Sequence, residues 1–314
     1  MPTRRSLPND LLLRMTCLMM PPNFAKYAKL ADEVRETAEA FTVPLALLWL
    51  ADDKQNIRRV ENGSGVLVKI GSAHIVLTAG HVAVSARRAD AIHIGIQSDR
   101  HLWIPALTIG SVHVPGTFSD LGYMIIDPAD ASRPTIASKV YANPQRRIAV
   151  LTATELAAKR CHAFVVGYPF AVMDTQPTGQ GVRLLVWHTA ITGSDEEVQD
   201  VTASPHSIGL VVPESQYASF PVPATDVELP PLSGVSGGGM WIVEQGHDGN
   251  ASGETATLVG LHIATGYDNG QRLAREVMIG HVLRLLAYEQ LAIREDIYGM
   301  FPRLQDDEWD VSLT

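Results

Sequence analysis

Leu232-Ser-Gly-Val-Ser-Gly-Gly-Gly-Met-Trp241 is a glycine-rich stretch that places the hydroxyl of Ser236 just before an apolar strand candidate. A serine hydroxyl is a weak nucleophile near neutral pH, so a catalytic serine needs a neighbouring base and backbone N–H donors for the oxyanion. The surrounding glycines can take φ values closed to other residues and so turn several N–H groups toward one point. By itself, the stretch fits a plain glycine-rich turn between strands equally well.

Two upstream segments supply the partners that a nucleophilic serine requires. His81 follows the apolar run 75–80 at the point where the chain turns, and Asp120 heads the apolar run 121–126. A histidine can take the serine proton, and a carboxylate can orient that histidine and stabilise its charged form. Three other aspartates, which lie in or beside turns or prolines, are weaker rivals of Asp120: Asp99, Asp127 and Asp174.

These segments together resemble the trypsin/chymotrypsin-like serine proteases, and more specifically bacterial members without disulfides such as the HtrA-type proteases. Three blocks carry the match in the family's order: Gly63-Ser-Gly-Val leading to Leu77-Thr-Ala-Gly-His81, then Asp120-Leu-Gly-Tyr-Met-Ile-Ile126, then Ser233-Gly-Val-Ser-Gly-Gly238. Gly167-Tyr-Pro169 also resembles the opening of the family's second barrel. The resemblance spans roughly residues 60 to 290.

The resemblance implies a mainly β protein with two six-stranded antiparallel β-barrels, an N-terminal helical arm and a C-terminal helix. It implies that His81, Asp120 and Ser236 form a catalytic triad between the barrels, with an oxyanion hole made by the N–H groups of Gly234 and Ser236. Where the family usually has Asp and Pro, this chain has Val235 and Gly239. Without an acid at position 235, a newly cut N-terminus has no ion-pair partner, so we expect no activation by N-terminal trimming.

The segment 258–266 stands where the family lines its primary specificity pocket. His262 resembles the histidine with which glutamyl endopeptidases and picornavirus processing proteases recognise Glu or Gln, and an imidazole can donate to either oxygen. Ser233 lies near the second polar group of those relatives, but Pro231 replaces their threonine or serine. A buried histidine held by a backbone carbonyl is the alternative. Three residues would pair with the substrate backbone by strand addition: Ile263, Ala264 and Thr265.

The spacing of hydrophobic residues elsewhere in the chain predicts its helices, strands and domains. Helical spacing predicts an amphipathic helix over 23–42, which packs in cis or binds a partner, and a C-terminal helix over 275–295. An apolar run predicts a first strand over 44–50, and many short apolar runs separated by turns predict a sandwich or barrels. The predicted units are an N-terminal helical arm at 1–60, a first barrel at 61–150, a second barrel at 151–274, and a C-terminal helix with an acidic tail at 275–314.

The amino-acid composition limits the kinds of binding partner and the cellular compartment that we expect. The chain has 314 residues, 46% hydrophobic and 19% charged, with a net charge of −9, so no basic footprint indicates nucleic acid or an anionic membrane. Two cysteines are too few for a disulfide framework. No run approaches the roughly 18 apolar residues of a membrane span, and charged residues interrupt the apolar N-terminal run that could suggest a signal peptide. We expect a cytoplasmic protein with no cofactor, and no metal because the histidines lack ligand spacing.

The expected function is a serine endopeptidase of restricted specificity, acting on protein or peptide substrates, with a regulatory partner at the N-terminal arm. One alternative is a non-catalytic peptide-binding or scaffold protein on the same fold. A remote alternative is an esterase, because Gly234-x-Ser236-x-Gly238 fits a nucleophile elbow. That elbow needs a strand before the serine, whereas a proline-rich loop precedes Ser236, and only Asp268 with His281 could complete its order of catalytic residues.

Overall fold

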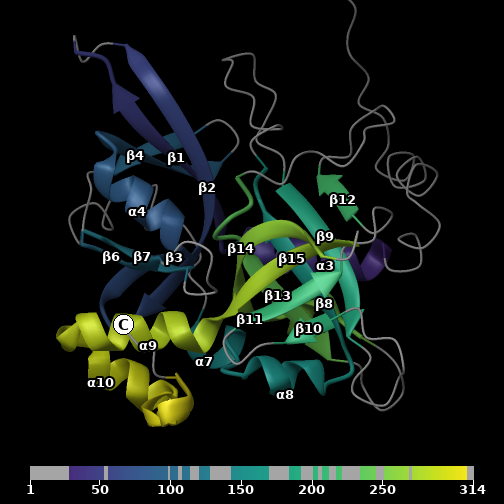
Figure 1. Cartoon of the computed structure of the whole chain (residues 1–314). Helices are drawn as coiled ribbons and strands as arrows, with labels where there is room; N and C mark the ends of the chain where they lie inside the picture. The colour runs from purple at the N-terminus through teal and green to yellow at the C-terminus, as the bar shows by residue number, and fades with distance from the viewer. Residues whose placement is uncertain are drawn as a thin grey trace, which may run out of the picture.

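The computed structural model of the chain (Figure 1) describes thirteen segments. These are residues 28–52, 56–97, 100–104, 108–113, 120–127, 143–169, 184–191, 201–203, 207–211, 217–220, 234–244, 251–268 and 271–309.

The first half of the described chain forms a seven-stranded sheet. Its strands are β1 (Thr42–Leu50), β2 (Ile57–Ile70), β3 (Ala73–Ala79), β4 (Ala91–Gln97), β5 (Arg100–Ile104), β6 (Ile109–His113) and β7 (Asp120–Ile126). They lie in the order β5-β4-β1-β2-β3-β7-β6, and every neighbouring pair is antiparallel. Helix α4 (Gly80–Arg88) follows β3 directly and packs against β6 and β7.

The second half forms an eight-stranded antiparallel sheet. Its strands are β8 (Cys161–Gly167), β9 (Leu184–Ile191), β10 (Val201–Ala203), β11 (Ser207–Val211), β12 (Tyr217–Phe220), β13 (Gly239–Glu244), β14 (Thr257–Asp268) and β15 (Gln271–Met278). They lie in the order β10-β11-β15-β14-β13-β8-β9-β12. Every residue of β8 is buried, as are the first five residues of β13, so these central strands form much of the core. Figure 1 shows the two sheets side by side, with the first on the left.

The expected pair of closed six-stranded barrels is wrong in two respects. Closure requires the two edge strands of a sheet to pair, and among the described residues β5 does not pair with β6, nor β10 with β12. The first sheet also has a strand that the prediction placed in the N-terminal arm. Strand β1 lies between β2 and β4, with Leu45 opposite both Gly63 and Ile94, and this insertion widens the sheet.

Two helices and two short 3₁₀ turns follow the second sheet. They are α9 (Ile279–Glu289), α10 (Leu291–Met300), η3 (Pro302–Gln305) and η4 (Asp307–Trp309). The predicted helix over 275–295 begins too early, because residues up to Met278 pair with β14 and β11 as part of β15. Trp309 is fully buried against Gly280, whose missing side chain leaves room for the indole, and its ring lies 5.0 Å from that of His281.

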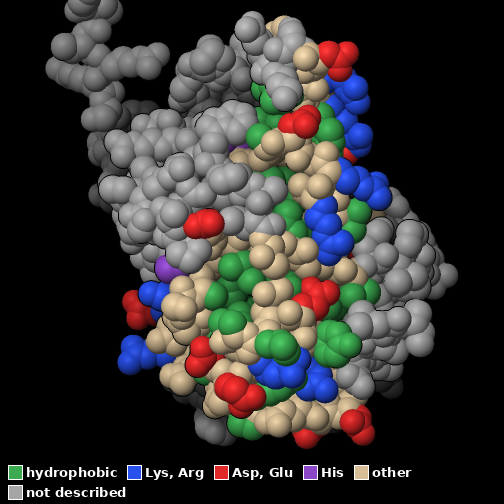
Figure 2. Space-filling model, turned by 90° about the vertical axis from the view of Figure 1, so that its left-hand side faces the viewer, with side chains coloured by type: hydrophobic (Ala, Val, Ile, Leu, Met, Phe, Trp, Pro, Cys, Tyr) green, Lys and Arg blue, Asp and Glu red, His purple; other side chains and the backbone are tan. Residues whose placement is uncertain are grey.

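Three further short helical segments lie between the strands: α7 (Pro144–Arg147), α8 (Ala153–Ala157) and η2 (Gly253–Thr255). None of the helices in the described part of the chain is both long enough and apolar enough to span a bilayer. On the face shown in Figure 2, acidic and basic side chains are interspersed with hydrophobic ones.

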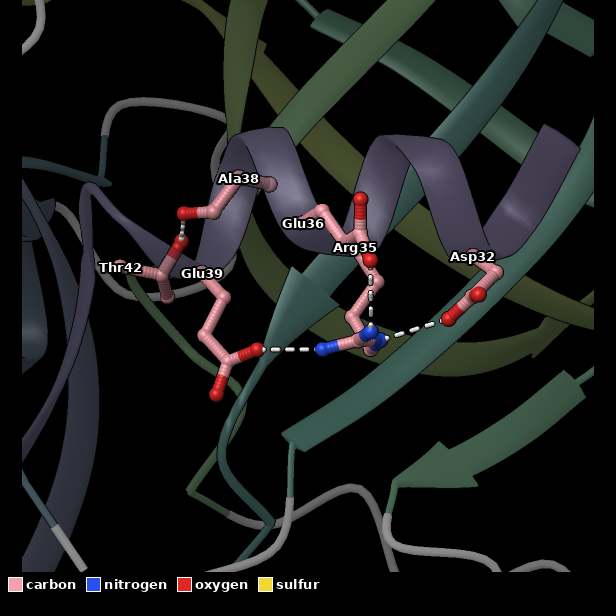
Figure 3. A network of polar contacts seen from close by, with 6 residues as sticks. All are labelled: Asp32, Arg35, Glu36, Ala38, Glu39 and Thr42. Atoms are coloured by element: carbon pink, nitrogen blue, oxygen red, sulfur yellow. Dashed lines mark hydrogen bonds and ion pairs between the residues drawn. The ribbon is translucent and has the colours of Figure 1, made fainter. Parts of the chain in front are cut away.

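Helix α3 (Ala28–Glu39), at the N-terminal end of the described chain, packs against the second sheet. Ala31, Val34 and Ala38 are fully buried on one side of it, and the helix packs against β8, β9, β13 and η2. On another side, Arg35 pairs with three acidic side chains of the same helix (Figure 3): Asp32, Glu36 and Glu39. Immediately afterwards the chain enters β1, so this short segment connects the two sheets.

Candidate active site

His81 lies in the first turn of α4, directly after strand β3. Because Ala79 pairs with Leu121 across β3 and β7, the turn into α4 brings His81 beside Asp120, the first residue of β7. Gly80 permits this approach, since a Cβ there would stand 2.4 Å from the carbonyl oxygen of Val112 and 2.8 Å from Asp120 Oδ1. The local fold therefore depends on a residue without a side chain immediately before the histidine.

Asp120 accepts two hydrogen bonds from His81. Its Oδ1 accepts from the His81 backbone N–H at 2.6 Å, and its Oδ2 lies 2.6 Å from His81 Nδ1. The side chain of Asp120 is 7% exposed and that of His81 is 40% exposed. The carboxylate is therefore shielded from water and fixes the ring through Nδ1, which makes Nε2 the nitrogen available to act as a base.

Residues 234–238, here called the nucleophile loop, form a tight turn before β13. Gly234 and Gly237 have φ values of 95° and 88°, which strongly favour glycine. The Gly238 N–H donates to the Val235 carbonyl at 2.7 Å, and the Gly237 N–H donates to the His262 carbonyl at 2.7 Å. Ser236 itself is partly exposed. The loop is thus held by its own backbone and by strand β14.

The nucleophile loop also binds the first sheet. The N–H of Ser64 in β2 donates to the Ser236 carbonyl at 2.8 Å. A Cβ on the neighbouring Gly63 would stand 2.8 Å from Val82 Cγ1 and 3.5 Å from the Ser236 carbonyl oxygen. The Ser236 carbonyl and Val82, the residue that follows His81, therefore both lie beside Gly63, where the two sheets join.

Two backbone N–H groups of the nucleophile loop and the side chain of Val235 bear on the predicted oxyanion site. Within the residues that the structure describes, the N–H groups of Gly234 and Ser236 donate to no acceptor. Val235, where the protease family usually has an aspartate, is fully buried and packs on Gly167, at which a Cβ would lie 2.8 Å from Val235 Cγ1. Position 235 therefore makes an apolar contact and carries no charge for an ion pair.

His262 lies beside the nucleophile loop and is held by a residue that the sequence analysis missed. Its N–H donates to the Gly238 carbonyl at 2.8 Å, and its Nδ1 lies 2.9 Å from Glu276 Oε1. Its Nε2 lies 3.3 Å from the hydroxyl of Thr265. Both His262 and Glu276 are buried, and Glu276 Oε2 has no hydrogen-bond partner among the described residues. The partner is thus a carboxylate, rather than the backbone carbonyl that the alternative interpretation supposed.

The remaining candidates divide between the described residues and the rest of the chain. Ser233, Asp99 and Asp174 lie outside the described residues, and Asp127 is exposed just beyond β7. Ile263 is buried, whereas Ala264 is exposed and Thr265 is partly exposed. No group of three potential metal ligands is found within the described segments. His281, which the esterase alternative needs as its base, is buried on α9 against Trp309.

Comparison with known proteins yields structural neighbours alone. No protein-family model matches the chain, and no curated protein matches it. Among the solved structures that it resembles are two described as proteases.

One of them is a thermostable serine protease, AL20, from an extremophilic microorganism, with 11% identity over 79% of this chain and 92% of that chain, at a TM-score of 0.41. Another is the protease Anisep from Arthrobacter nicotinovorans, with 13% identity over 76% of this chain and 90% of that chain, at a TM-score of 0.43. At such identities and scores, the chemistry assigned to this chain rests on its own geometry.

Proposed function

We propose that this chain is a serine endopeptidase of restricted specificity, with Ser236 as nucleophile, His81 as general base and Asp120 as the group that orients the base. One observation carries the proposal: a buried carboxylate holds His81 through two hydrogen bonds, and the next residue on α4, Val82, lies beside Gly63 together with the Ser236 carbonyl. A histidine whose Nδ1 is held by a carboxylate can take a proton from a neighbouring hydroxyl through Nε2.

The reaction would proceed through an acyl-enzyme. The Ser236 hydroxyl attacks the scissile carbonyl carbon while His81 Nε2 takes its proton, and Asp120 stabilises the resulting imidazolium. The N–H groups of Gly234 and Ser236 receive the oxyanion. His81 then gives its proton to the leaving amine, which breaks the peptide bond. Water then attacks the ester in the same way, giving its proton to His81, and His81 returns a proton to Ser236 as the acid product leaves.

Strand β14 supplies a surface for an extended peptide. Strand β13 pairs with β14 as far as Leu261, and beyond His262 the described residues place no strand on that side of β14. A substrate could pair there with residues 263–265 as an added strand. This edge of β14, unpaired among the described residues, supports a protein or peptide as the substrate.

For the residue before the cleaved bond, we propose glutamate or glutamine. Because Glu276 binds Nδ1 of His262, a substrate side chain would hydrogen-bond to Nε2. It would replace the Thr265 hydroxyl, which lies beside Nε2 in the structure. Profiling against a peptide library tests this preference. His262→Leu should abolish it, whereas cleavage after Arg or Lys by the unaltered chain would contradict it.

A fluorophosphonate probe tests the reaction class without knowledge of the substrate. We expect labelling that peptide mapping assigns to Ser236, loss of labelling in Ser236→Ala, and strong weakening in His81→Ala. Ser85→Ala is a matched control, because this serine lies on α4 outside the nucleophile loop. Absence of labelling in the full chain, combined with peptide binding along β14, would favour the non-catalytic binding protein instead.

A further inference from the structure

Ser64 makes hydrogen bonds through all of its polar groups while being fully buried. Its N–H donates to the Ser236 carbonyl at 2.8 Å, and its hydroxyl donates to the Gly234 carbonyl at 2.8 Å. The same hydroxyl accepts from the Tyr168 N–H at 2.9 Å, just beyond β8. Its carbonyl accepts from the Thr78 hydroxyl at 2.7 Å. One residue of β2 therefore joins β3, the end of β8 and the nucleophile loop.

These bonds fix three successive peptide units of the loop. The carbonyl of Gly234 is held by the Ser64 hydroxyl, that of Val235 by the Gly238 N–H, and that of Ser236 by the Ser64 N–H. In a trans peptide unit the N–H points opposite to the carbonyl, so a fixed carbonyl also fixes the next N–H. The bond to the Val235 carbonyl therefore fixes the direction of the Ser236 N–H, and Ser64 holds the peptide units before and after it.

We propose that Ser64 is a positioning residue that holds the nucleophile loop ready to bind the oxyanion, in place of the ion pair that Val235 makes impossible. The inference rests on the proposed function for its catalytic meaning, although the hydrogen bonds stand without it. It follows that the full chain reacts with a serine probe without prior cleavage.

The hydroxyl is the part of Ser64 that alanine or glycine cannot supply. Every residue except proline has the N–H that holds Ser236, but one hydroxyl both donates to Gly234 and accepts from Tyr168. Alanine would leave a buried carbonyl and a buried N–H unpaired. Side chains larger than threonine are disfavoured, because even a Cβ on Gly167 would stand 3.2 Å from Ser64 Oγ.

The test compares Ser64→Ala and Ser64→Thr with Thr42→Val. Thr42 is a matched control because it is also buried in the first sheet and donates one hydroxyl bond, to the Ala38 carbonyl at 2.8 Å (Figure 3), away from the nucleophile loop. We expect Ser64→Ala to lower kcat and the rate of fluorophosphonate labelling by roughly tenfold to a hundredfold, with KM within about twofold. Ser64→Thr should recover most of the loss, and Thr42→Val should show none.

Hydrogen exchange gives a second readout that does not depend on activity. The amides of Gly237 and Gly238 should exchange faster in Ser64→Ala and unchanged in Thr42→Val, because only the first substitution releases the loop. If the unaltered chain is inert and unlabelled while this difference persists, the proposed function fails and the positioning role stands. If labelling occurs but Ser64→Ala matches Thr42→Val in both readouts, the positioning role is wrong and the proposed function stands.

Discussion

Replacing Asp120 by asparagine should abolish nearly all of the reactivity of Ser236 while preserving the fold. The Asp120 Oδ1 accepts from the His81 backbone N–H at 2.6 Å, and a backbone donor cannot change its role. The amide oxygen of asparagine must therefore stay there, which places the amide NH₂ opposite His81 Nδ1, where Oδ2 now lies at 2.6 Å. The ring must then accept at Nδ1 and carry its proton on Nε2.

The size of the effect follows from the free-energy cost of the tautomer that catalysis needs, in which Nδ1 carries the proton and Nε2 can accept one. That tautomer would set two N–H groups against each other in a site where the Asp120 side chain is 7% exposed, so water offers little relief. We expect a loss of about 10⁴ in rate, equivalent to about 5 kcal/mol.

The assay is the second-order rate constant for fluorophosphonate labelling of Ser236 near neutral pH, with the melting temperature as a check on the fold. Asp127→Asn is the matched control, because this aspartate stands exposed just beyond the same strand and should leave the rate unchanged. A correctly folded Asp120→Asn variant that labels within tenfold of the unaltered chain would refute the assigned role.

Gly237→Ala should lower both labelling and the melting temperature, because a Cβ at φ 88° would stand 2.1 Å from a carbonyl oxygen of β2 and the backbone strain alone is about 1–3 kcal/mol; normal labelling would contradict it. Trp309→Ala should cost about 3–5 kcal/mol in urea denaturation. Gly280→Ala should also destabilise, since a Cβ would lie 2.2 Å from the Trp309 ring, whereas Gly299→Ala, with nothing within 4 Å, should not. Burial raises the pKa of Cys161 to about 12, so its thiolate fraction at pH 8 is about 10⁻⁴. Peptide mapping should therefore find Cys161 alkylated in urea but not in the native protein.

Much of the strand pattern could be predicted because it depends on local sequence. The hairpin of β2 and β3 and the strands predicted over 121–126 and 240–243 follow from short apolar runs bounded by turns, and the structure confirms them as parts of β2, β3, β7 and β13. The pairing of His81 with Asp120 was predictable because each residue stands at a strand end, where side chains from neighbouring strands meet.

The errors arose where distant residues decide the outcome. Residues 275–278 have an apolar spacing that also suits a helix, and pairing with β14 makes them a strand. That helical prediction concealed Glu276, whose place opposite His262 appears only once β14 and β15 are aligned. The role of Ser64 was hidden for a similar reason, since its hydroxyl bonds to a carbonyl 170 residues away.

The segment that leads from α3 into β1 has a consequence for synthesis on the ribosome. Phe41 stacks on Trp241 with ring centroids 5.9 Å apart, and its carbonyl accepts from the Leu67 N–H at 2.8 Å. The apolar side of α3 emerges long before β8 and β13 exist to cover it. During synthesis, the N-terminal part of the chain therefore cannot reach its final packing before the second sheet is made. Until the residues around Trp241 have left the exit tunnel, the apolar side of α3 stays uncovered, as a surface that chaperones can bind.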